Sequence, residues 1–414
     1  MTIAPARRDI SSDAPDAAEL LIEEARRKGR RRRLRTGMAF LLVIVAIVVL
    51  VIFAVGGVPI SAPRPSGTNA APPTGVNFSS ALVPRFDEPV AIAVTESDVW
   101  VVNMAGNSIT EFDAKSGSQV RVINTKTDSF HHPDGIAIQG SHIWITNGNE
   151  EFGMGTSNYP LARYSSITEL NASNGSLVRV INARTDQFLQ PGPVVSSGSH
   201  IWVLNANSAQ GLDSAPMNAL IELNASNGSL VHIFKTNVDG LYGALNLTAT
   251  RSDVWVTNAN GYENSVTELN ANDGSLVRVI RSNGNLVAPD SVAVSGGRVW
   301  IANIRDTNNS ITEFNSSDGS FVREIKAKAD KFGGLFGIAA QGSHVWVTNS
   351  NEFDQSVTEL NASNGSLVRV IKAKADDFHE ATGIVARGTK LWVLNSNSVT
   401  ELNASNGALI RVVK

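Results

Sequence analysis

Histidine and carboxylate side chains occur together at two points of a sequence that is otherwise highly repetitive. His131 and His132 are followed by Asp134, and His379 is followed by Glu380. Imidazole and carboxylate groups are the usual general acids and bases of enzymes, and they also bind cations and polar ligands. The sequence contains no cysteine, which excludes a thiol nucleophile, a disulfide framework and a cysteine-ligated metal site.

A second group of polar residues lies where the repeated units differ from one another in length. One long segment, residues 148–165, contains Glu150 and Arg163, whereas the corresponding segment 395–398 is minimal. Insertions on one face of a repeat protein often mark its binding face. The remaining candidates of this kind are Arg305, Asp306, Glu352 and Asp354, whereas Asp290 lies, like the histidines above, in a loop between units.

Seven tryptophans indicate the elements that must position these residues. They recur at intervals of 44 to 58 residues, and an asparagine follows each of them by three positions. A fixed period in this range is typical of solenoids, propellers and other repeat arrays. The tryptophans are Trp100, Trp144, Trp202, Trp255, Trp300, Trp346 and Trp392.

The pattern inside one unit predicts four short β-strands. In residues 135–181 the strand-like segments are 135–139, 142–147, 166–171 and 177–181, separated by turn residues and one insertion. No segment after residue 85 has a sustained helical period. Four-stranded antiparallel units repeated seven times describe an all-β protein, a seven-bladed β-propeller that spans residues 86–414. We expect the candidate residues to line the mouth of its central channel, and the tryptophans to pack between blades.

The second strand of the unit resembles a known repeat. It reads WITN at residues 144–147 and WVTN at residues 255–258 and 346–349. With tryptophan in place of tyrosine, this is similar to YVTN-type seven-bladed propellers, which grade into NHL and virginiamycin B lyase-like propellers. The resemblance covers all seven units and implies the propeller fold, but such propellers bind, scaffold or catalyse. The His/Glu pair of the lyase-like propellers cannot be located here by motif, so no catalytic residue is transferred.

Charged and polar residues that recur in every unit are predicted to be structural. A glutamate recurs in the third strand and an arginine in the fourth, with His232 in the third unit. We expect peripheral ion pairs worth at most about 1 kcal/mol each if exposed. His142, His200 and His344 are expected in surface turns. The asparagines three positions after the tryptophans are expected to form hydrogen bonds with the backbone of the next turn. Asn-x-Ser triplets such as 171–173 and 174–176 are explained by turn chemistry rather than by glycosylation, and the Asn-Gly pairs by the positive φ of tight turns.

The N-terminal part predicts a membrane anchor. Residues 1–37 hold ten Lys/Arg and six Asp/Glu, a net charge of +4 within an overall −3. Residues 38–55 carry no charge or proline and would form a helix of about 27 Å. We therefore predict a transmembrane signal-anchor helix over 38–58 and a Pro/Gly/Ser-rich linker over 59–85. A cleaved signal peptide is the alternative, but no convincing Ala-x-Ala site follows.

The positive-inside rule places the basic segment in the cytoplasm and the propeller outside the plasma membrane. We expect a single-pass, membrane-tethered module that binds a protein or a polar small molecule, without a cofactor, a metal or nucleic acid. The alternative is an extracytoplasmic lyase or hydrolase that uses histidine and carboxylate groups at the mouth. The last unit, ending at residues 408–413, should supply its own fourth strand, although residues 76–83 offer another.

Overall fold

The computed structural model describes most of the chain after residue 85. The described residues are 86–124, 130–148, 165–182, 191–205, 218–235, 240–259, 264–281, 284–304, 309–326, 332–350, 355–372 and 378–414. The predicted anchor (38–58) and linker (59–85) lie outside these residues. Within the described part no helix is long and apolar enough to cross a membrane.

In the described part of the chain, twenty-eight strands form seven four-stranded sheets. Blades 1 and 2 consist of β1 (Pro89–Val94), β2 (Asp98–Asn103), β3 (Ser108–Asp113), β4 (Gln119–Ile123), β5 (Pro133–Gln139), β6 (His142–Asn147), β7 (Ser166–Asn171) and β8 (Leu177–Asn182). Blades 3 and 4 consist of β9 (Pro191–Ser197), β10 (His200–Asn205), β11 (Asn218–Asn224), β12 (Leu230–Lys235), β13 (Ala244–Ala249), β14 (Asp253–Asn258), β15 (Ser265–Asn270) and β16 (Leu276–Arg281).

Blades 5 to 7 continue the same pattern. They consist of β17 (Pro289–Ser295), β18 (Arg298–Asn303), β19 (Ser310–Asn315), β20 (Phe321–Lys326), β21 (Leu335–Gln341), β22 (His344–Ser350), β23 (Gln355–Asn361), β24 (Leu367–Lys372), β25 (Gly383–Arg387), β26 (Lys390–Asn395), β27 (Ser398–Asn403) and β28 (Leu409–Val413).

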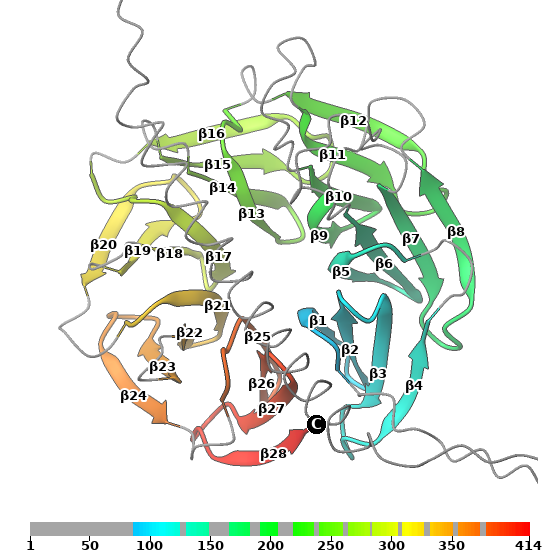
Figure 1. Ribbon diagram of the computed structural model, residues 1–414. Helices are drawn as coiled ribbons and strands as arrows, with labels where there is room; N and C mark the ends of the chain where they lie inside the picture. Colours follow the sequence, from blue (N-terminus) through cyan, green and yellow to red (C-terminus); the bar gives the residue numbers. More distant parts are fainter. Residues whose placement is uncertain are drawn as a thin grey trace, which may run out of the picture. The chain divides into compact units, whose positions relative to one another are not determined.

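The sheets are arranged as the blades of a wheel (Figure 1). The first strand of each blade lies nearest the centre and the fourth lies at the rim. Every blade takes its four strands from one continuous stretch of chain, in sequence order and antiparallel. The prediction of a seven-bladed propeller is therefore confirmed. So is the expectation that blade 7 supplies its own fourth strand, β28.

The tryptophans pack between neighbouring blades, as predicted. All seven are almost completely buried in the second strands. Trp202 of blade 3 belongs to a cluster with Leu247 and Val254 of blade 4. Trp392 of blade 7 contacts Phe112 of blade 1, with 5.8 Å between ring centroids, so the last and first blades meet through the same contact as any other pair.

In the turns between the third and fourth strands, the glycine has a positive φ. The asparagine that precedes this glycine does not. Gly175 has φ +71°, whereas Asn174 is not among the residues with positive φ. The Gly175 N–H donates to the Asn171 carbonyl (2.8 Å), and the Asn171 side chain accepts from Ser173. The prediction of positive φ is thus confirmed only for the glycine of each Asn-Gly pair.

We predict that Trp255→Ala costs about 3–5 kcal/mol of unfolding free energy, because it removes a fully buried indole between blades 4 and 5. Chemical unfolding followed by circular dichroism measures this. Leu276→Ala in the same blade is the matched control, since Leu276 is 47% exposed and its truncation should cost less than about 1 kcal/mol. Equal losses for the two variants would contradict the packing described.

Candidate functional site

The described candidates at the predicted mouth all lie at or near the beginning of a first strand. His131, His132 and Asp134 lie at the start of β5, Asp290 is the second residue of β17, and His379 and Glu380 precede β25. First strands run in the same direction in each blade and surround the centre (Figure 1). These candidates therefore share one end of the ring. The candidates Glu150, Arg163, Arg305, Asp306, Glu352 and Asp354 lie outside the described residues.

In six blades the residue shortly before the first strand has a left-handed backbone conformation. Two of these six residues are candidates from the sequence. His132 has φ 45° and Glu380 has φ 52°. A left-handed conformation costs roughly 1–2 kcal/mol for residues other than glycine, so the surrounding contacts must hold it. Among the described residues the set is Glu88, His132, Gly243, Ala288, Gly334 and Glu380, and the residue directly before β9 in blade 3 lies outside the described part of the chain.

Polar side chains of the preceding blade hold these two left-handed residues. The His132 N–H donates to Asn107 Oδ1 of blade 1 (2.7 Å), and the Glu380 N–H donates to Gln355 Oε1 of blade 6 (2.5 Å). His379 Nδ1 lies 3.0 Å from Ser396 Oγ in its own blade. These residues therefore join neighbouring loops at the mouth.

A β-bulge follows the left-handed residue and presents one extra residue at the channel end of the first strand. Pro133 pairs with Asn147 and Gly135 with Thr146, which leaves Asp134 as the extra residue. Asp290 has the same position in β17, where its Oδ2 accepts from Ser291 Oγ (2.9 Å). Bulges next to binding sites commonly re-aim a side chain. The two aspartates thus occupy equivalent positions in blades 2 and 5.

Two exposed residues at the same end were missed by the sequence analysis. Tyr242, 54% exposed, occupies the position of His131 and His379, two residues before the first strand of blade 4. Leu245, 40% exposed, is the bulge residue of that strand. Aligning the seven strand entries, rather than searching for ionisable residues, would have found both. Among the described residues no three His, Asp or Glu side chains come together as a group that could hold a metal ion.

The recurring glutamates are buried, which corrects the expectation of peripheral, exposed ion pairs. Their side chains are 0–3% exposed, and each faces the tryptophan of the second strand and the arginine or histidine of the fourth. In blade 2, Glu169 Oε2 lies 2.5 Å from Arg179 Nε. Burial raises the pKa of Glu169, and likewise the pKa values of Glu222 and Glu313, although the neighbouring cations oppose the shift. The glutamates in question are Glu111, Glu169, Glu222, Glu268, Glu313, Glu359 and Glu401.

A second side chain reaches each glutamate from the start of the second strand. His142 Nδ1 lies 2.7 Å from Glu169 Oε1, and in blades 5 and 7 Arg298 and Lys390 take the same place. The expectation that His142, His200 and His344 lie in simple surface turns is therefore wrong: these histidines contact buried carboxylates. The free variation at this position suggested exposure, but in five blades its residue is a His, Arg or Lys that contacts the buried glutamate.

Blades 1 and 4 place an aspartate where the other blades place a cation. Asp98 begins β2 and Asp253 begins β14, each in a Thr-x-Ser-Asp turn held by the threonine hydroxyl. Burial raises the pKa of Glu111 from 4.5 to about 7, with Asp98 adding to the shift. The pKa of Glu268 is likewise raised to about 7 by burial, with a contribution from Asp253. These two blades are therefore the ones with a neighbouring pair of carboxyl groups.

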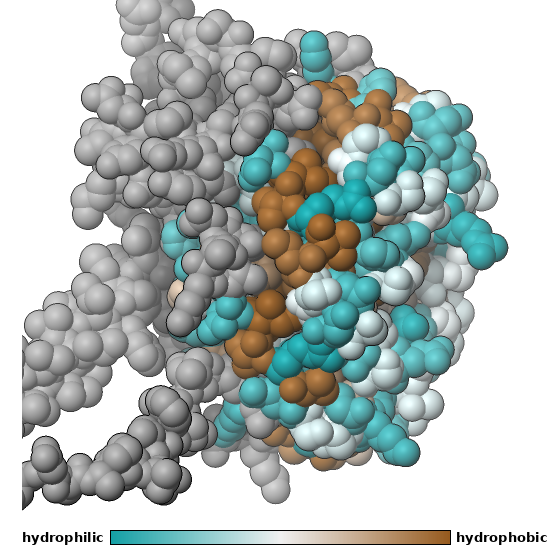
Figure 2. All heavy atoms as spheres, turned by 90° about the vertical axis from the view of Figure 1, so that its right-hand side faces the viewer, coloured by the Kyte–Doolittle hydropathy of each residue, from teal (hydrophilic) through white to brown (hydrophobic). Residues whose placement is uncertain are grey.

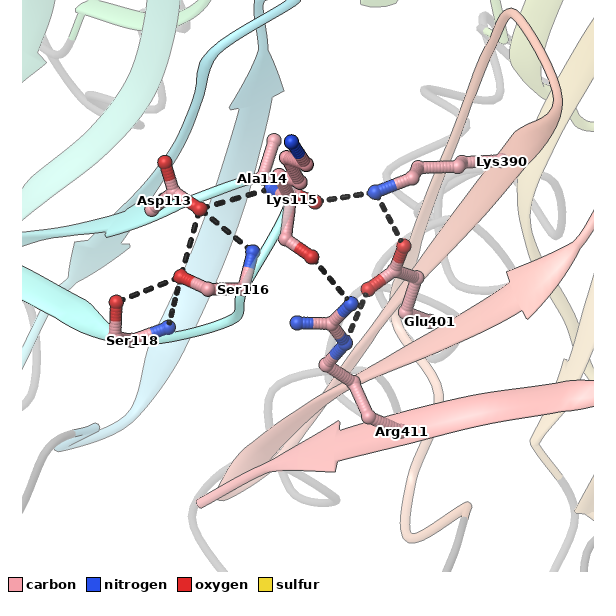
Figure 3. A network of polar contacts seen from close by, with 8 residues as sticks. All are labelled: Asp113, Ala114, Lys115, Ser116, Ser118, Lys390, Glu401 and Arg411. Atoms are coloured by element: carbon pink, nitrogen blue, oxygen red, sulfur yellow. Dashed lines mark hydrogen bonds and ion pairs between the residues drawn. The ribbon is translucent and has the colours of Figure 1, made fainter.

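Fourth-strand arginines connect a blade to the next at six of the seven boundaries. Arg121 Nη2 of blade 1 donates to the Ser173 carbonyl in the blade 2 turn (3.1 Å). The same bond joins the ends of the chain: Arg411 donates to the Lys115 carbonyl (2.6 Å) and contacts Glu401, while Lys390 donates to the Ala114 carbonyl (Figure 3). Ring closure therefore depends on side chains in blade 7 and a turn in blade 1. The remaining arginines in this role are Arg179, Arg278, Arg323 and Arg369.

The asparagines that follow the tryptophans form hydrogen bonds mainly with side chains of the third strand, and less often with the backbone of a turn. Asn103 Nδ2 donates to Thr110 Oγ1 (2.9 Å) and Ser108 Oγ (3.2 Å) of the third strand. The predicted bond to a backbone turn accompanies this in blade 5, where the Val287 N–H donates to Asn303 Oδ1 (3.2 Å). These asparagines therefore have a structural role at the end of the second strand.

The outer wall carries apolar side chains in every blade. Figure 2 shows such side chains among polar ones on the wall formed by blades 1 to 3. In β8, for example, Leu177 is 46% and Val178 39% exposed. Because all fourth strands share this feature, it does not distinguish a site on one blade.

We predict that Asp253→His makes the protein more stable at neutral pH and flattens its pH dependence. The pKa of Glu268 is raised on folding, so its favourable contribution is complete below the unfolded value and is lost as the pH rises through about 7. A histidine at position 253 would reproduce the pairing of blade 2. Free energies of unfolding measured between about pH 5 and about pH 8 test this.

The matched control is Glu96→Gln, which removes an exposed carboxylate from the turn before β2 of blade 1. An unchanged pH slope in Asp253→His would contradict the role assigned to the carboxyl pair.

Comparison with known proteins gives the fold alone. No family model and no curated protein matches this chain. Its structure is similar to Kuenenia stuttgartiensis hydrazine synthase (TM-score 0.59, 13% identity, 80% of this chain and 99% of that chain). It is also similar to a functionally unknown protein from Desulfotomaculum acetoxidans (TM-score 0.56, 13% identity, 77% and 95%) and to U3-55K (TM-score 0.55, 12% identity, 76% and 95%). These likenesses are to β-propellers of varied function.

Proposed function

We propose that this chain is a binding or scaffold module, a propeller held outside the plasma membrane by an N-terminal anchor and related to YVTN-type repeats. The observation that supports binding is that the repeated and the unrepeated polar residues have different places in the ring. Repeated ones hold the blades together, whereas Asp134, Asp290 and Tyr242 break the repeat at one end of the ring. Such an end, with two carboxylates and exposed apolar groups, suits a protein or polar ligand.

The described histidines and acids favour binding over lyase or hydrolase chemistry. His132 and Glu380 hold left-handed backbone through their N–H groups, and His379 contacts a serine hydroxyl. General acid–base catalysis needs such groups directed together at one substrate atom. The described candidates are instead spread over blades 2, 5 and 7, and the imidazole of His379 is directed at the Ser396 hydroxyl of its own blade.

The absence of cysteine allows one experiment to test both orientation and binding. Tyr242→Cys at the mouth and Leu276→Cys on the outer wall each introduce a single reactive thiol in an exposed position. Intact cells are treated with a membrane-impermeant maleimide that carries a photoreactive group, and are then irradiated. We expect both variants to be labelled and only Tyr242→Cys to give a discrete crosslinked adduct.

Two results would contradict the proposal in different ways. Labelling that requires permeabilised cells would refute the outward orientation. Labelling without an adduct, or with the same adducts from both positions, would refute a binding face at the mouth.

A further inference from the structure

The boundary between blades 3 and 4 lacks the arginine that links every other pair of blades. In β12 the position belongs to His232, and no bond from His232 to the blade 4 turn occurs among the described contacts. The glycine of that turn, Gly274, faces Phe234 and Glu222, whereas Gly228 in the previous turn faces Ile181 and Arg179. An aromatic ring and a carboxylate thus replace an aliphatic chain and a guanidinium.

Glu222 depends on histidines alone for its positive partners. His200 Nδ1 of β10 lies 2.6 Å from Glu222 Oε1, and His232 of β12 is the other cation that acts on it. From blade 4, Asp273 contributes a negative charge. In the other blades the fourth-strand partner is an arginine, which stays charged at all physiological pH values.

We propose that the boundary between blades 3 and 4 is a pH-sensitive seam, at which the ring loosens locally as the pH rises, because a histidine takes the place that an arginine holds in the fourth strand of every other blade. An imidazole can lose its charge within the physiological pH range, whereas a guanidinium cannot. With neutral rings as its partners, the buried Glu222 would have the Asp273 charge beside it and no cation to oppose it. Burial also raises the pKa of the Glu222 carboxyl group. A raised carboxyl pKa likewise weakens the seam at higher pH, because the stability that the protonated group contributes is present at low pH and is lost as the pH rises.

Other contacts across the seam keep the blades adjacent. Ser197 Oγ donates to the Thr250 and Arg251 carbonyls (2.6 and 3.3 Å), and Trp202 belongs to one buried cluster with Leu247 and Val254 of blade 4. The junction of the chain ends, in contrast, has bonds from both Arg411 and Lys390. The weakest boundary is therefore inside the chain, and the expected event is local opening rather than separation of the ends.

Hydrogen exchange of the full 414-residue chain, read by mass spectrometry at about pH 5.5 and about pH 8, tests the seam. Protection factors are compared between the blade 4 turn (271–274) and the blade 7 turn (404–407). We expect the blade 4 turn to lose about tenfold more protection at the higher pH, the effect of one charge-assisted hydrogen bond. His232→Arg should abolish this difference.

Arg369→His is the matched reverse change, because Glu359 of blade 6 already has His344 as its second partner. It should make the blade 7 turn pH-sensitive, and it decides the matter alone if His232→Arg does not fold. Equal protection of the two turns at about pH 8, a larger loss at the 114–117 turn, or no effect of Arg369→His would overturn the proposal.

Discussion

Each blade contains a glutamate side chain that solvent barely reaches, and the cations that link neighbouring blades are arranged around it. The carboxylate faces the tryptophan of the second strand, pairs with the arginine of the fourth in six blades, and holds that arginine against the turn of the next blade. A buried ion pair is a poor source of net stability, since desolvation offsets its attraction. Its contribution here is directional, because the guanidinium both neutralises the carboxylate and fixes the spacing of two blades.

This arrangement explains how the first and last blades meet. Blades 7 and 1 are each built from consecutive strands, and among the described residues no strand pairing joins the two sheets. Arg411 and Lys390 extend from Glu401 to two carbonyls of the blade 1 turn (Figure 3), while Trp392 packs on Phe112. The closing contact is the ordinary contact between blades together with the bond from Lys390 to the Ala114 carbonyl.

The architecture could be predicted from the sequence because its signals are periodic: Trp144 and its six counterparts, and the turn glycines such as Gly175. The burial of the Glu169 side chain could not be predicted, because the alternation of residues along one strand does not reveal that neighbouring blades cover both faces of the sheet. The contact of His142 with the Glu169 carboxylate could not be predicted for the same reason. The left-handed His132 and the bulged Asp134 were chosen for their chemistry, whereas the structure shows positions defined by backbone geometry. Tyr242 is not found by a search for acids and histidines, and an alignment of the seven strand entries is the sequence signal that points to it.

The central claim, that buried carboxylates hold the blades, is tested most directly by their titration. Carbon-13 NMR of the full chain with labelled glutamate carboxyl groups follows each carboxylate as the pH changes. The structure predicts two resonances that titrate near pH 7 and disappear in Glu111→Gln and Glu268→Gln, respectively. Titration of every glutamate in the ordinary range near about pH 4.3 would contradict the account.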